Sequence, residues 1–153
     1  MQQTMSIPTT DLTTRPPRSA RTRLGGYALL PRMLDKGRAE LLGKNGDYHF
    51  ACPLDQSILS FLGLDAAALK TELATGKGDG EILEWIEANA KHPRSAFEIA
   101  QWSAWRDQVV PAGVESREFF TSLHKEAGPK REDIATWADL LDLDDYVSFG
   151  GKA

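Results

Sequence analysis

Proline and glycine divide this chain into short segments, and the apolar residues within each segment recur every three or four positions. Pro31 and Pro53 suit the first turn of a helix, whereas Gly43, Gly63 and Gly76 suit the residue that ends one. Recurrence at this spacing is typical of helices that bury one face. The pattern therefore predicts an all-α protein of about six helices, arranged as a helical bundle.

Local signals predict where several of these helices begin and end. Asp65 is a suitable N-cap for a helix over residues 66–75, and Asp79 for the next helix. Ser95 and Glu98 have the spacing of a capping box, and a last helix is predicted over about 131–141. Residues 48–51 are short and lack a second strand to pair with, which favours a connector over a strand.

The length and composition predict one small domain preceded by an arm. The chain has 153 residues, of which 41% are hydrophobic and 26% charged, enough for one core. Pro16 and Pro17 favour an extended conformation, so we expect an arm over residues 1–23 and a single helical domain over 24–153.

We expect a cytoplasmic protein with no membrane contact. No apolar run approaches the roughly 20 residues of a membrane-spanning helix, and the polar opening does not resemble a secretory signal. The single cysteine, Cys52, cannot form an internal disulfide. The three histidines lie on separate segments, so neither a metal nor another cofactor is predicted.

Charge is distributed unevenly along the chain. Residues 1–38 carry a net charge of +5 and the remainder −9, which together give the overall −4. The acidic excess makes nucleic-acid binding unexpected. The basic third is expected either to dock on the acidic remainder or to meet a small anion.

The most specific candidate site is the group of basic residues beside the Gly25–Gly26 pair. Guanidinium groups that converge there would grip a carboxylate or phosphate in a bidentate manner, and Asp35 is spaced to orient Arg32 or Arg38. The same residues would equally form an ion-pair network that anchors the arm, and the sequence favours this structural interpretation of the cluster. The predicted anion-binding residues are Arg21, Arg23, Gly25, Gly26, Arg32, Asp35, Lys36 and Arg38.

Binding of a small anion is the first functional prediction, and two alternatives stay beside it. In one, the arm and the aromatic C-terminal tail form an interaction or self-association module, which would make the protein a homo-oligomer. In the other, Cys52 is the nucleophile of a thiol-dependent enzyme and His49 is its base, since Cys52 precedes Pro53 at the start of a helix.

Several segments together resemble a bacterial family catalogued as domain of unknown function 5069. The resemblance implies a bacterial cytosolic protein with one small helical domain, and it implies no reaction, cofactor or catalytic residue. The segments that carry it are Asp11-Leu12, residues 15–19 and 24–39, Gly46-Asp47-Tyr48, residues 52–55 and 80–85, and Asp144-Asp145-Tyr146.

Overall fold

The computed structural model describes residues 6–153, so residues 1–5 of the predicted arm lie outside the described part. The prediction of an all-α fold is confirmed, with seven helices in the described part where about six were expected. A two-residue hairpin, β1 (Arg23–Leu24) with β2 (Tyr27–Ala28), precedes the first helix. The helices are α1 (Leu30–Leu41), α2 (Pro53–Leu62), α3 (Ala66–Leu73), α4 (Asp79–Asn89), α5 (Ala96–Gln108), α6 (Val114–Ala127) and α7 (Trp137–Ser148).

Most of the predicted helix ends are confirmed. Pro31 and Pro53 lie in the first turns of α1 and α2, and the Asp65 carboxylate accepts a hydrogen bond from the N–H of Ala68. Ser95 and Glu98 form the expected capping box at the start of α5. Residues 48–51 form a connector without strand pairing, as expected.

Two predicted helix starts are wrong. Gly78, not Asp79, is the N-cap of α4, and the Asp79 carboxylate pairs with arginines instead. The last helix begins at Trp137 instead of near residue 131, because Thr136 and Asp139 form a second capping box. It then continues to Ser148, so much of the aromatic tail is helical.

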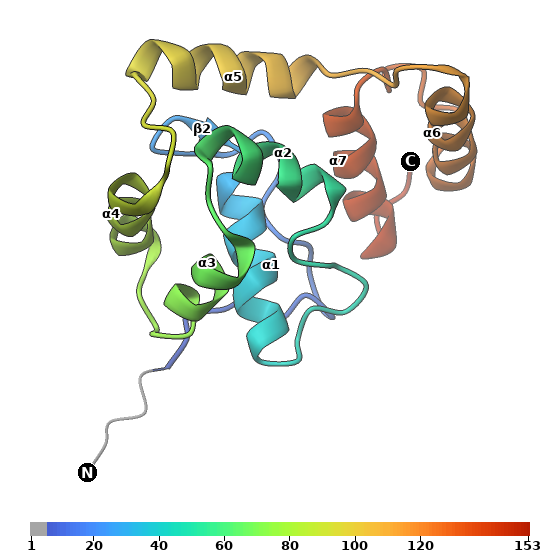
Figure 1. Ribbon diagram of the computed structural model, residues 1–153. Helices are drawn as coiled ribbons and strands as arrows, with labels where there is room; N and C mark the ends of the chain where they lie inside the picture. The colour runs from blue at the N-terminus through green and yellow to red at the C-terminus, as the bar shows by residue number, and fades with distance from the viewer. Residues whose placement is uncertain (1–5) are drawn as a thin grey trace.

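The core surrounds α1, which is buried from Leu30 to Ala39. Figure 1 shows α1 at the centre of the molecule, with α2, α3 and α4 around it and α5 across one end. Leu34, Leu62 and Ile86 belong to this main core, and each is almost completely excluded from solvent. A smaller apolar cluster, which includes Phe120 and Leu143, joins α6 to α7.

The arm packs against the domain along its described length. Residues 6–22 contain neither helix nor strand, and Leu12 and Ala20 are buried. The N–H of Leu12 donates to the carbonyl of Lys44, just after α1. None of the helices in residues 6–153 combines the length and the apolar character needed to cross a bilayer.

Candidate functional site

The charged side chains of α1 are buried and paired with carboxylates from other helices. Arg32 donates to Asp145 of α7 over 2.7 Å, and only 3% of its side chain is exposed. Lys36 lies 3.0 Å from Asp55 of α2, whose side chain is fully buried. Burial raises the pKa of Asp55, whereas the Lys36 ammonium and the N–H of Ala51 act in the opposite direction. These two cations are therefore already neutralised inside the protein.

Asp35 and Arg38 form a second group with Arg18 of the arm. Arg18 pairs with Asp35 over 2.9 Å and with Asp79 over 2.7 Å, and Arg38 donates to Asp79 over 2.6 Å. Asp35 thus meets Arg18 instead of the predicted Arg32 or Arg38. This group lines a shallow cavity of about 530 Å³, together with the exposed Arg15.

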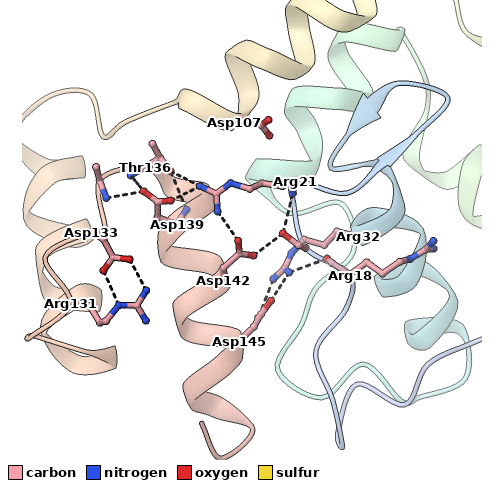
Figure 2. A network of polar contacts seen from close by, with 12 residues as sticks. Arg18, Arg21, Arg32, Asp107, Arg131, Asp133, Thr136, Asp139, Asp142 and Asp145 are labelled. Carbon is pink, nitrogen blue, oxygen red and sulfur yellow. Dashed lines mark hydrogen bonds and ion pairs between the residues drawn. The ribbon is translucent and has the colours of Figure 1, made fainter. Parts of the chain in front are cut away.

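Arg21 and Arg23 reach two further helices. Figure 2 shows Arg21 extended toward α7, where it pairs with Asp139 and Asp142. Arg23 pairs with Asp107 of α5 over 2.7 Å. Burial alone would raise the pKa of Asp139, but the N–H groups of Ala135 and Thr136, together with Arg21, lower it to about 2.

The paired glycines serve packing. Both have positive φ angles, and a Cβ on Gly25 would lie 2.7 Å from the side chain of Leu83. A Cβ on Gly26 would lie 3.1 Å from Ile99. Gly25 and Gly26 therefore contact apolar side chains, and they line none of the cavities that hold the predicted basic residues.

The predicted ion-pair network is confirmed, and the arginines predicted to bind an anion do not converge on one cavity. Arg32, Arg38 and Arg21 line three different cavities. Each of these arginines has a carboxylate partner in the same chain. The geometry consequently favours a cation outside this N-terminal group as the partner of any bound anion.

A polar cavity of about 670 Å³ brings both predicted catalytic residues together with Arg32 and Lys36. Cys52 is the N-cap of α2, and the Lys36 ammonium lies 3.3 Å from its sulfur. His49 lines the same cavity, but no hydrogen bond links it to Cys52 in the described residues. The two predicted catalytic residues are thus neighbours without the contact that a nucleophile and its base require.

A second cavity, of about 530 Å³, is bounded by four helices, and we call it the Arg106 cavity. It adjoins the polar cavity, since Cys52, Leu54, Leu141 and Asp144 line both. Its walls are mainly apolar side chains of α6 and α7. The remaining lining residues are Pro53, Arg106, Val109, Phe119, Leu123, Trp137 and Leu140.

Arg106 is the exceptional residue of this cavity. It projects from α5 and is 91% buried, with a relative exposure of 9%. It makes no hydrogen bond and no ion pair with any residue in the range 6–153, where every other buried arginine or lysine has a carboxylate partner. Its guanidinium carbon lies 5.3 Å from the ring centre of Trp105. Burial lowers the pKa of Arg106, and the nearby charge of Asp107 compensates only in part.

Sequence reasoning missed Arg106, although a signal was present. Ile99, Trp102, Ser103 and Arg106 follow one another at helical spacing, so they share one face of α5. Ser103 is buried and donates a hydrogen bond to the carbonyl of Gly26 over 2.6 Å, which identifies this face as the inner one. An arginine on the inner face of an amphipathic helix is the pattern that would have singled it out.

Comparisons with known proteins give a family and no activity. A family model described as "Domain of unknown function (DUF5069)" matches residues 14–147. No curated protein matches the chain.

Proposed function

The chain belongs to this family, whose description assigns no activity, and we propose from the geometry that it binds a small organic anion with an apolar body in the Arg106 cavity. The observation that carries the proposal is Arg106, a residue that is 91% buried and whose guanidinium lines an apolar cavity without an anionic partner in residues 6–153.

The electrostatics of Arg106 support an anionic ligand. A buried charge without a partner is costly, and an arginine keeps its proton inside proteins. A carboxylate in the cavity would accept two parallel hydrogen bonds from the guanidinium. Binding would therefore compensate a charge that the folded protein leaves uncompensated.

The walls of the cavity support an apolar body on the ligand. Trp137 and Leu123 offer an aromatic and an aliphatic surface, and Phe119 lies near the ring of Trp137 while remaining 60% exposed. A volume of about 530 Å³ falls within the common range for small-molecule sites. Apolar walls with one charged group are the usual composition of such sites.

The N-terminal basic residues fit the anion less well than Arg106 does. An anion at Arg32 would have to compete with Asp145, and one at Arg38 with Asp79. Displacing the buried Asp145 carboxylate from Arg32 would leave that carboxylate unpaired, at a cost in free energy larger than a new contact supplies.

The two other sequence-based alternatives stay predictions. The arm packs on its own chain through Leu12 and Ala20, so self-association would have to use a different surface of the arm. Thiol catalysis would require His49 to move toward Cys52 or another base to replace it.

Thermal unfolding with matched probes tests the proposal. The probes are 3-phenylpropionate, its uncharged amide, and acetate, which has no apolar body. We expect 3-phenylpropionate to raise the melting temperature and the other two to have little effect, because a ligand stabilises the state that it binds.

Two variants test whether Arg106 is responsible for the rise in melting temperature. Arg106→Met keeps a long side chain and removes the charge, and we expect it to abolish the shift. Arg117→Met removes an exposed arginine of α6 and should leave the shift intact. A shift of equal size in Arg106→Met and in the unmodified protein would disprove the proposed site.

A further inference from the structure

Asp144 contributes a second charge to the Arg106 cavity. It lies on α7 and lines both this cavity and the adjoining polar one. It makes no side-chain hydrogen bond and no ion pair with any residue in the described part of the chain. Partial burial raises the pKa of Asp144 and the neighbouring charge of Asp145 raises it further, whereas the charge of Arg32 acts in the opposite direction. Asp144 is an exposed residue at the edge of the cavity, and its carboxylate forms no ion pair in residues 6–153.

The two charges do not neutralise each other. No nitrogen of Arg106 lies within 4.0 Å of a carboxylate oxygen of Asp144, the distance at which ion pairs occur elsewhere in this protein. A ligand that carries only an anion would satisfy Arg106 and place its own negative charge in the cavity that Asp144 also faces. A ligand that carries both charges would satisfy Arg106 and Asp144 together.

We propose that the ligand is a zwitterion with an apolar side chain, of the class of the apolar α-amino acids. This inference rests on the proposed function. The ligand's carboxylate pairs with Arg106, its ammonium group pairs with Asp144, and its side chain contacts Leu123 and Trp137. The negative charge of Asp144 thus acts as the selectivity determinant between amino acids and simple carboxylates.

The remaining groups near Asp144 are consistent with an ammonium group at this place. Arg32 and Lys36 line the adjoining cavity, but Asp145 and Asp55 already neutralise them. Asp47 also lines that cavity, without an ion pair in residues 6–153. The unpaired charge on this side is therefore negative, opposite to that of Arg106.

Calorimetric titration with matched compounds tests the inference. L-phenylalanine is compared with 3-phenylpropionate, which lacks the ammonium group, and with phenethylamine, which lacks the carboxylate. L-leucine and 4-methylpentanoate form a second pair with an aliphatic side chain. We expect each amino acid to bind roughly ten- to a hundred-fold more tightly than its simple carboxylate, which is the usual effect of one charged hydrogen bond.

Asp144→Asn is expected to remove this preference, so that L-phenylalanine and 3-phenylpropionate bind within about three-fold of each other. Asp47→Asn, which changes a carboxylate of the polar cavity alone, should keep the preference of the unmodified protein.

The outcomes separate this inference from the proposed function. If the simple carboxylates bind as tightly as the amino acids, and Arg106→Met abolishes their binding, the anion site stands and the inference is wrong. A preference for the amino acids that survives in Asp144→Asn also overturns it. If no compound binds, both the proposed function and the inference fail for this ligand class.

Discussion

At the scale of single residues, the molecule separates its buried charges into paired and unpaired ones. Lys36 and Arg32 are buried and have carboxylate partners at 3.0 and 2.7 Å. Arg106 is buried without one in residues 6–153. Paired charges of this kind join helices, and the proposed ligand site rests on this unpaired buried cation beside a cavity.

Asp55→Asn is expected to destabilise the protein strongly. The substitution leaves the Lys36 ammonium buried without a counter-charge, which costs about 3–5 kcal/mol. Asp133→Asn, in the exposed pair of Asp133 with Arg131, should change the free energy of unfolding far less, because water screens this pair. Urea unfolding measures both changes, and equal losses would show that the buried pair has no special role.

Arg106→Met is expected to stabilise the ligand-free protein while it abolishes binding. The change removes an unpaired buried charge and keeps most of the apolar stem, so the free energy of unfolding should rise by about 1 kcal/mol or more. Guanidinium chloride unfolding without ligand measures this. A clear loss of stability would mean that Arg106 has a structural partner, which would contradict its assignment to the ligand.

At the scale of elements, close packing around α1 limits which residues the central helix accepts. A Cβ on Gly37 would lie 2.7 Å from Leu73 of α3 and 3.2 Å from the ring of Phe50. Leu73 is fully buried, so it has little room to move away. Gly80 lies in the first turn of α4, and a Cβ there would meet nothing within 4 Å.

Gly37→Ala and Gly80→Ala are expected to change stability in opposite directions. Alanine favours a helix over glycine by about 1 kcal/mol, so Gly80→Ala should stabilise the protein by up to that amount. At Gly37, overpacking of about 1–3 kcal/mol opposes this gain. Thermal unfolding measures the change in stability of each variant. If Gly37→Ala stabilises the protein as much as Gly80→Ala does, the close packing around α1 is contradicted.

Local signals predicted helix ends well where the cap is formed by nearby residues. The spacing of Ser95 and Glu98 predicts the capping box that starts α5, and Thr136 with Asp139 has the equivalent spacing at the start of α7. Asp79 resembles a cap in the local pattern, because its true partners, Arg18 and Arg38, are distant in the sequence. The inner position of Arg106 depends in the same way on how α5 packs against β2 and α7.

At the scale of the whole molecule, the uneven charge distribution serves to attach the arm. The basic arm pairs with carboxylates on three helices of the acidic remainder: Arg18 pairs with α4, Arg21 with α7 and Arg23 with α5. The docking of the basic third on the acidic remainder, one of the two expectations from the sequence, is therefore confirmed within the chain.

Acid should weaken both the N-terminal cap of α7 and the attachment of Arg21 to it over a defined pH range. The pKa of Asp139 is about 2 in the folded protein and has an ordinary value of 3.8, so its contribution is present above about pH 4 and is lost as the pH falls through 2. The contribution is at most about 2 kcal/mol. We expect Asp139→Asn to be less stable than the unmodified protein at pH 7, and the difference to shrink between pH 4 and 2.

Denaturant unfolding across this pH range measures the effect. Glu84→Gln is the control, since Glu84 is exposed and has no ion pair in the described residues. A difference between Asp139→Asn and the unmodified protein that stays constant from pH 7 to pH 2 would contradict the assigned role of the Asp139 charge.

The most direct test of the whole account is a methyl NMR titration with 3-phenylpropionate. If Arg106 holds the anion, the largest shifts should appear at Leu123, Leu140 and Leu141, which line its cavity. The methyl group of Thr10, in the cavity of Arg18 and Arg38, should stay unchanged. If only the signal of Thr10 shifts and the leucine signals of the Arg106 cavity do not, the account is contradicted. The anion would then bind near the N-terminal arginines.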